Sequence, residues 1–214
     1  MHIPDGFLSP QTFLPAYAVA AAAWGWAVRG LRRRLDEATV PRLAALTALA
    51  YGLGLVMLPL PGGTSGHALG VAMLALLFGV RAAFLAYSLV LVLQSLLFGA
   101  GGITALPVNA LAMGLAGALV AVAVFRLLRG WSVTAAVAAA AWCSVVLPAL
   151  LVAAVLGAQP LIAQRADGTP LFFPFGFSIV LPAVLLPHLL IGVGEALLTL
   201  FVWRFARARR WVAA

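Results

Sequence analysis

The sequence of 214 residues contains no lysine, a single cysteine and only five acidic residues. A phosphate-binding loop of the Walker type needs a lysine, so no such ATP-binding motif is present. The single Cys143 excludes an internal disulfide, and its position within an apolar run favours a packing role over thiol chemistry. Glu195 is the only acidic residue in an apolar segment. This scarcity argues against an ion carrier without partner subunits, whose pathway would be lined by several carboxylates.

Charge of either sign is scarce, and long apolar runs take its place. Hydrophobic residues make up 65% of the chain and charged residues 8%, with a mean hydropathy of +1.14. These values lie far outside the range of soluble domains and predict a polytopic membrane protein. The net charge of +8 arises from thirteen arginines that cluster at the ends of apolar segments. Their placement follows the positive-inside rule and argues against a folded nucleic-acid-binding face.

Seven apolar segments are predicted to cross the membrane. They read as residues 11–29, 43–60, 67–80, 82–99, 107–127, 132–157 and 179–203. The third is short for about 30 Å of hydrocarbon, and a re-entrant segment is the alternative. Charge favours a full span. With seven spans and an outside N-terminus, twelve of the thirteen arginines face the cytoplasm, whereas only six do so without the third span.

We therefore expect an all-α fold: a bundle of about seven transmembrane helices with an extracytoplasmic N-terminus and a cytoplasmic C-terminus. Residues 1–214 are expected to form one integral membrane domain. Its parts would be an N-terminal segment 1–10 that chelates a metal, a helix bundle 11–203 and a basic cytoplasmic tail 204–214.

The first residues suggest metal chemistry, because a histidine directly follows the first methionine in Met1-His2-Ile3-Pro4-Asp5-Gly6. This segment lacks the features of a cleavable signal peptide, so the amino terminus is expected to stay free. The terminal amine, the amide nitrogen of His2 and its imidazole Nδ1 can close two adjacent chelate rings on one ion. Nitrogen ligands of this kind suit Ni(II), Cu(II) or Co(II), with square-planar geometry. One further nitrogen would complete the site.

The predicted topology brings a second histidine to the same membrane side. His67 follows the loop 60–66 at the outer mouth of the third segment. A lone histidine near a helix start is usually a satisfied polar residue. Beside a chelating terminus it supplies the missing fourth nitrogen, so Met1, His2 and His67 are the predicted metal ligands.

Five other polar residues are candidates for supporting the metal site or for coupling. His188 and Glu195 lie seven residues apart in the last segment, close to two helical turns, and so share one helix face. Ionisable residues at such depth normally point into the bundle. Gln94 and Asn109 bracket a glycine-rich turn, and Ser65 precedes His67. The alternative for these residues is simple hydrogen bonding between packed helices.

Four motifs together resemble the CbiM/NikM family, the substrate-binding membrane components of cobalt and nickel energy-coupling-factor transporters. The motifs are Met1 to Leu8, the Gly-Thr-Ser-Gly-His run at 63–67, Phe98 to Asn109, and His188 to Glu195. The resemblance extends from residue 1 to about residue 200. It implies seven membrane helices with an amino terminus that inserts from outside into the bundle. It also implies the same ligands: the Met1 amine, the His2 amide and imidazole, and the His67 imidazole.

The resemblance implies partners as well. ATP hydrolysis would belong to a pair of cytoplasmic ATPases joined to a transmembrane coupling subunit, often with a small accessory membrane subunit. Small residues at four-residue spacing in the first segment would let the coupling subunit's helix approach closely. The expected function is high-affinity binding and uptake of cobalt or nickel, with the ion as substrate and no catalytic cofactor. Ala100 and the loop 158–178 depart from some relatives, which leaves the preferred metal open.

An enzymatic alternative comes from Ser65 and His188. The Gly63-Thr64-Ser65-Gly66 stretch and the sequence after His188 superficially resemble the motifs of rhomboid intramembrane serine proteases. A buried serine activated by a histidine could cleave a helix within the bilayer. This hypothesis leaves the His2 terminus unexplained, and it requires Ser65 and His188 to lie within hydrogen-bonding distance.

Overall fold

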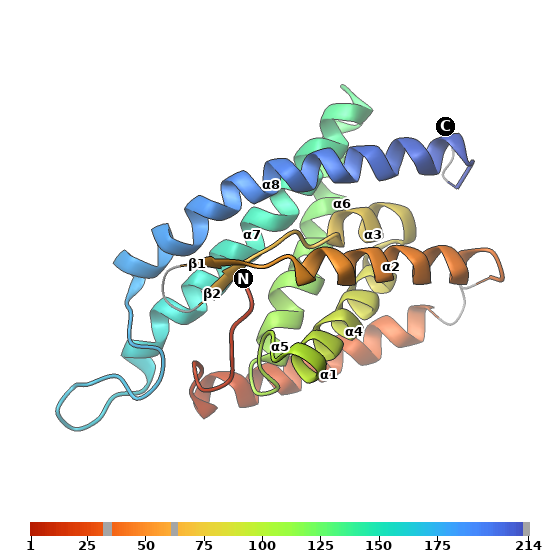
Figure 1. Ribbon diagram of the computed structural model, residues 1–214. Helices are drawn as coiled ribbons and strands as arrows, with labels where there is room; N and C mark the ends of the chain where they lie inside the picture. Colours follow the sequence, from red (N-terminus) through yellow and green to blue (C-terminus); the bar gives the residue numbers. More distant parts are fainter. Residues whose placement is uncertain (32–35, 61–63, 212–214) are drawn as a thin grey trace.

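The computed structural model describes residues 1–31, 36–60 and 64–211 (Figure 1). Arg32, Arg33 and Arg34 of the predicted cytoplasmic cluster and residues 61–63 of the predicted outer loop lie outside this part. The helices are α1 (Pro10–Leu31), α2 (Thr39–Leu55), α3 (Val71–Phe78), α4 (Val80–Phe98), α5 (Leu106–Asn109), the π-helical η1 (Ala110–Ala116), α6 (Gly117–Leu128), α7 (Val133–Ile162) and α8 (Phe177–Ala208). Two short strands, β1 (Leu58–Leu60) and β2 (Thr64–Gly66), pair antiparallel.

The helices are those of a multi-pass membrane protein. Because α5, η1 and α6 follow one another without a break, the described residues contain seven helical segments. Four of these are long and apolar enough to cross a membrane: α4, the continuous run Leu106–Leu128, α7 and α8. The predicted all-α membrane fold is confirmed in these elements. Which membrane side each end faces stays a prediction.

The third segment differs from the predicted helix over 67–80. Its helix, α3, has only eight residues and therefore spans about 12 Å at 1.5 Å per residue. Residues before it are extended, with Gly66 of β2 opposite Leu58 of β1. Gly70 has a φ of +71° and Gly79 a φ of +84°, conformations that glycine adopts without strain and that end a helix at both sides. Hydropathy predicted a membrane segment here but did not reveal that residues 67–70 lie outside the helix.

The ends of three other predicted segments also moved. Helix α7, predicted to end at 157, continues to Ile162. The second segment, predicted over 43–60, is helical only to Leu55, because residues 58–60 form β1 around Pro59, whose ring lacks an amide donor. The last helix continues to Ala208, beyond the predicted end at 203. Arginine side chains are long enough to carry their charge to the membrane surface while the backbone stays helical. The first residues of the predicted basic tail are therefore part of α8.

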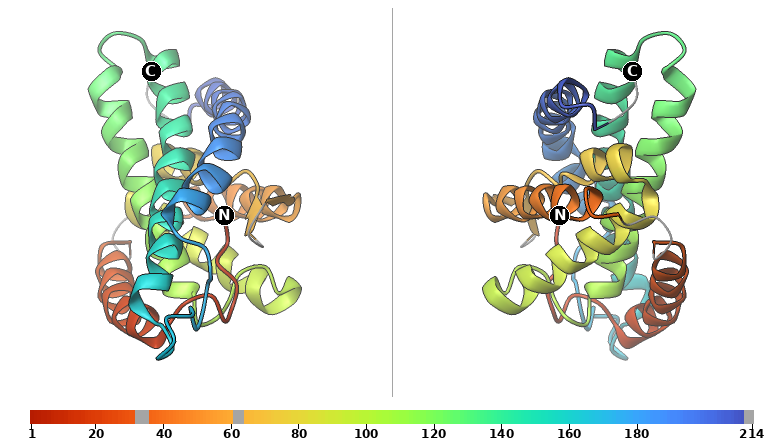
Figure 2. Two further views of the ribbon diagram at one scale, coloured as in Figure 1. Left: turned by 90° about the vertical axis from the view of Figure 1, so that its left-hand side faces the viewer. Right: turned by 90° about the vertical axis from the view of Figure 1, so that its right-hand side faces the viewer.

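Both ends of the N-terminal segment 1–9 are buried in the bundle, whereas Asp5 and Gly6 between them are exposed. Met1, Ile3 and Leu8 are buried, and both views in Figure 2 place the N-terminus near the middle of the molecule. Asn109 fixes the segment from two sides, since it accepts a hydrogen bond from the Ile3 amide at 3.1 Å and donates one to the Ile3 carbonyl at 3.1 Å. Farther along, the Ser9 amide donates to Gln159 Oε1 at 2.9 Å.

Close packing of α7 and α8 sets the rotation of α8 about its axis. A Cβ added at Gly192 would lie 2.8 Å from the ring of Trp142, so only glycine permits this approach. The Trp142 indole also donates to the Leu189 carbonyl at 3.1 Å. Both contacts hold α8 so that His188 and Glu195 face the interior, where both are fully buried.

Candidate metal centre

Two histidines that are 65 residues apart in sequence meet in the interior of the bundle. His2 Nδ1 lies 3.1 Å from His67 Nε2, and the two rings are stacked with centroids 4.5 Å apart. His2 comes from the inserted N-terminal segment and His67 from the extended stretch between β2 and α3. Their side chains are 3% and 2% exposed. The structure thus brings together two of the three residues that the sequence predicted as ligands, His2 and His67.

Hydrogen bonds on the far side of each ring assign its tautomer. His2 Nε2 lies 3.0 Å from Gln94 Oε1, which can only accept, so Nε2 carries the proton. His67 Nδ1 likewise donates to the Ala68 carbonyl at 2.9 Å. The two nitrogens that face one another, Nδ1 of His2 and Nε2 of His67, therefore both carry lone pairs. With the Gln94 amide in this orientation neither nitrogen has a proton to donate to the other, and a cation that accepts both lone pairs would satisfy them.

Burial keeps the nitrogen groups of this site neutral. Removal from water lowers the pKa of the Met1 amine from 8.0 to about 4. Burial, followed by the nearby amine charge, lowers the pKa of His2 to about 3 although the bond to Gln94 opposes it. The pKa of His67 lies well below its usual range because of burial and then the charges of His2 and the amine. Neutral nitrogens are the form that binds metal ions.

Gln94 depends on a close contact between α2 and α4. A Cβ at Gly54 would collide with the Gln94 side-chain amide, so α2 can lie this close only because residue 54 is glycine. Gly101, with a φ of +85°, lies next to the His2 ring, and a Cβ there would lie 3.3 Å from His2 Cδ2. The predicted supporting roles of Gln94 and Asn109 stay proposals. Their observed contacts are with His2 and with Ile3, its neighbour in sequence.

Glu195 holds the backbone next to His67. Its two carboxylate oxygens accept hydrogen bonds from the Leu69 amide at 2.8 Å and the Gly70 amide at 2.7 Å. These amides are available because the stretch before α3 is extended and makes no helical hydrogen bonds. A buried carboxylate that receives two backbone donors is well satisfied. Sequence analysis placed Glu195 on the correct buried face but did not reveal its backbone partners.

His188 and Ser65 do not form a catalytic pair. His188 Nδ1 donates to the Val184 carbonyl at 2.6 Å, and its Nε2 has no partner among the described residues. Ser65 lies in β2 opposite Pro59 and makes no hydrogen bond with His188 in the described part of the chain. A serine nucleophile needs its base within hydrogen-bonding distance, so the geometry does not support the protease alternative.

Asp5 attaches the N-terminal segment to the loop before α5, a role that was not predicted from the sequence. Its carboxylate accepts hydrogen bonds from the Ile103 amide at 3.1 Å and the Thr104 amide at 2.8 Å. Partial burial acts to raise its pKa, but the bonds from Thr104 and Ile103 outweigh it and lower the pKa. An aspartate three residues after His2, within the first motif, was the available signal.

The site therefore has the composition of a transition-metal centre: neutral nitrogens, buried, with no charged ligand among them. Among the described residues, no three His, Cys, Asp or Glu side chains gather to hold an ion. A metal at this place would consequently need backbone nitrogens in addition to the two imidazoles. Fold and site together describe a membrane protein in which two buried imidazoles face each other.

The chain belongs to the CbiM family, described as the cobalt uptake substrate-specific transmembrane region, whose model matches residues 2–213. It is 38% identical over 206 residues to the fused nickel transport protein NikMN of Rhodobacter capsulatus, covering 93% of this chain and 59% of that protein. It is 39% identical over 211 residues to the probable fused nickel transport protein LarMN of Lactiplantibacillus plantarum, covering 97% of this chain and 64% of that protein. The chain thus spans about three fifths of these fused relatives.

The fold is also that of a solved structure. A truncated transition metal transporter superposes with a TM-score of 0.94 at 35% identity, over 98% of this chain and 99% of that one. The cobalt transport protein CbiM of Anoxybacillus flavithermus is 30% identical over 219 residues, covering 96% of this chain and 81% of that protein. These likenesses include relatives named for nickel and for cobalt.

Proposed function

We propose that this protein is the substrate-binding component of a cobalt or nickel uptake system and that it binds the ion through four nitrogens. These are the Met1 amine, the His2 amide, His2 Nδ1 and His67 Nε2. The observation that carries the proposal is that two imidazole nitrogens, His2 Nδ1 and His67 Nε2, face each other at 3.1 Å. Names of the relatives, which include nickel and cobalt transport proteins, support the choice of metals.

The distance between the two imidazole nitrogens suits one ion. Ligand nitrogens at about 2.0–2.1 Å from a metal, arranged at right angles, lie about 2.9 Å apart. The observed separation is therefore close to that of neighbouring ligands in a square-planar site. The amine and the amide of His2 precede its imidazole in the chain, so they would complete the plane as adjacent chelate rings.

The composition of the ligand set selects the metal class. Four nitrogens without carboxylate or water suit Ni(II), Co(II) or Cu(II) and disfavour Mg(II) and Ca(II), which prefer oxygen. Because the amine and both imidazoles are already neutral in the buried site, the ion displaces no proton from them. Only the His2 amide must lose its proton, which is released on binding.

Transport energy would come from other subunits. We propose a transmembrane coupling subunit and a pair of cytoplasmic ATPases, with a small accessory membrane subunit as a further partner, because this chain has no lysine for a phosphate-binding loop. The coupling subunit would contact α1, where the small residues Ala18 and Ala22 lie exposed one turn apart. Small residues at this spacing permit close helix approach in a membrane.

The ligand set is tested by displacing the amine. One alanine added before Met1 moves the amine out of the chelate while all side chains remain, and we expect stoichiometric Ni(II) binding by the purified protein to be lost. His67→Ala should also lose it. The matched control adds the same alanine after Ala214 and should bind Ni(II) as the unaltered chain does. Unchanged affinity and stoichiometry in the N-terminally extended protein, measured by calorimetry and elemental analysis, would rule out the amine as a ligand.

A further inference from the structure

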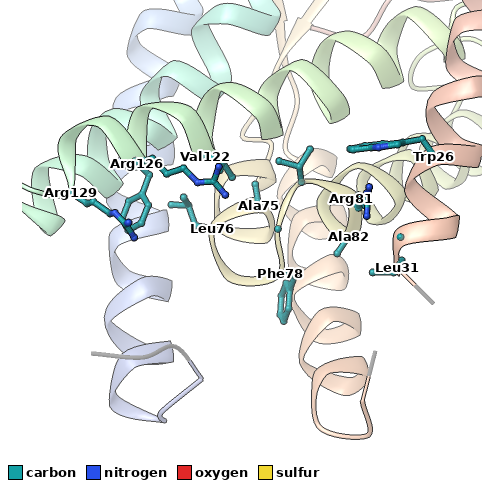
Figure 3. A pocket seen from close by; sticks show the side chains of 14 residues that line it. Trp26, Leu31, Ala75, Leu76, Phe78, Arg81, Ala82, Val122, Arg126 and Arg129 are labelled. Atoms are coloured by element: carbon teal, nitrogen blue, oxygen red, sulfur yellow. The ribbon is translucent and has the colours of Figure 1, made fainter. Parts of the chain in front are cut away.

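A cavity with three arginines in its wall lies where the ends of α1 and α6 meet the start of α4. It has a volume of about 450 Å³ and is bounded by the end of α1, the α3–α4 junction and the end of α6. Figure 3 shows the arginines of its wall: Arg81 from the start of α4, and Arg126 and Arg129 from the end of α6. Arg81 lies beside Trp26 on one side of the cavity, and Arg126 and Arg129 lie on the other, so the wall carries positive charge on both sides.

The charge in this cavity is not neutralised by its own wall. No aspartate or glutamate is among the described residues that line it. Arg81 instead lies over the ring of Trp26, with 4.6 Å between its guanidinium carbon and the ring centroid. A Cβ at Gly30 would collide with the same guanidinium, so α1 carries a glycine where Arg81 needs room. The fold thus positions Arg81 without giving it an anion.

An apolar groove adjoins the basic cavity. It has a volume of about 520 Å³ and runs between α2 and α4, with Leu43, Leu89 and Leu93 among its lining residues. Leu31 and Ala82 belong to the walls of both cavities. A polar, cationic space and an apolar one therefore meet at a shared wall, which is the arrangement that an amphiphile with an anionic head requires.

Tryptophans lie in the wall of the basic cavity and next to it in the sequence. Trp26 lines it, and Trp131, two residues after Arg129, is 90% exposed. Tryptophans at helix ends mark the interface between hydrocarbon and water. Basic pockets between membrane helices at this level bind phospholipid headgroups, and guanidinium groups match the paired oxygens of a phosphate.

We propose that this cavity binds the phosphodiester of an anionic phospholipid through Arg81, the arginine next to the groove, with Arg126 and Arg129 adding positive charge across the cavity and an acyl chain in the groove between α2 and α4. A free phosphate would use the arginines but gain nothing from the apolar groove. An acidic partner chain would leave the groove empty. A phospholipid would place its headgroup in the basic cavity and an acyl chain in the apolar groove. It would thereby hold together α1, α2, α4 and α6 at this end of the bundle.

The test is native mass spectrometry of the purified, delipidated full chain, titrated with phosphatidylglycerol in a phosphatidylcholine background. We expect one phosphatidylglycerol to be retained. Removing one arginine, in Arg81→Gln or Arg126→Gln, should weaken its binding about fivefold, since each basic residue contributes about that factor. Arg207→Gln removes an exposed charge on α8 that does not line the cavity, and should retain the lipid unchanged. Circular dichroism checks that all variants are folded.

Two further experiments distinguish the binding of a lipid from the binding of a small anion. Ala48→Phe fills the groove, because Ala48 lines it, and should weaken phosphatidylglycerol binding, whereas Ala45→Phe, on an exposed position outside the groove, should not. Inorganic phosphate should fail to displace the lipid. Displacement by phosphate with no effect of Ala48→Phe would show a small-anion site instead and would overturn the proposal. So would equal lipid retention by the Arg81, Arg126 and Arg207 variants, or no retention at all.

Discussion

Gly54 of α2 lies against the side-chain amide of Gln94 in α4, so closely that a Cβ at residue 54 would collide with it. Gln94 in turn lies 3.0 Å from His2 Nε2. The packing of α2 against α4 at Gly54, which is not itself a proposed ligand, therefore determines the orientation of His2, which is one. Metal centres depend on such supporting contacts about as strongly as on the ligands themselves.

Gly54→Ala is expected to weaken Ni(II) binding about tenfold or more. The added methyl displaces Gln94, and overpacking of this kind costs about 1–3 kcal/mol, part of which falls on the orientation of the His2 ring. Calorimetry on the purified protein measures the change. Gly52→Ala is the matched control, because it is also in α2 and a Cβ there meets nothing within 4 Å. Equal affinity in the two variants would contradict the proposed dependence.

Glu195→Gln should reduce both metal affinity and stability. The carboxylate accepts from two backbone amides, whereas a carboxamide offers one oxygen and turns its NH₂ group toward the second amide. An unsatisfied buried donor costs about 1–3 kcal/mol, and loss of a supporting contact typically reduces metal affinity about 10–100-fold. Thermal unfolding and Ni(II) titration measure the two effects.

Thr199→Val provides the comparison for Glu195→Gln on the same helix face. The Thr199 hydroxyl is buried without a partner among the described residues, so its removal should leave stability unchanged or slightly higher. If Glu195→Gln behaves like Thr199→Val in both measurements, the bonds to Leu69 and Gly70 do not support the site.

Insertion of the metal-free N-terminal segment should weaken as the pH falls. Burial lowers the pKa of the Met1 amine from 8.0 to about 4 and that of His2 from 6.5 to about 3, so the exposed segment takes up protons that the inserted one does not. The stabilising contribution is complete above about pH 8 and is lost as the pH falls toward 4. Each proton changes the free energy by about 1.4 kcal/mol per pH unit.

Hydrogen exchange of residues 1–9 in the metal-free protein measures this insertion. We expect protection to decline with falling pH, most steeply below pH 6.5, where both groups contribute. His2→Gln removes one titrating group and should show the shallower slope of the amine alone. Protection that is independent of pH between 8 and 4 would show that the segment is inserted in its protonated form.

Local composition carried much of the prediction. Apolar runs identified the membrane segments because burial in lipid demands continuous hydrophobicity, and α4, the run Leu106–Leu128, α7 and α8 each overlap a predicted segment. The third segment escaped this reasoning, since hydropathy does not distinguish a helix from an extended chain. Gly70 and Gly79 were visible in the sequence, but their positive φ angles depend on the packing of α3 against its neighbours.

By itself, the sequence determined the nitrogen chemistry of Met1 and His2, because adjacent donors in one short segment can chelate without any fold. It also indicated His67 through the alternation of membrane sides. Tertiary structure alone decided which lone pairs face each other and which groups hold them, since Gln94 and Glu195 reach the site across 92 and 126 residues of chain. Contacts at such separation depend on how closely helices pack, which no local pattern encodes.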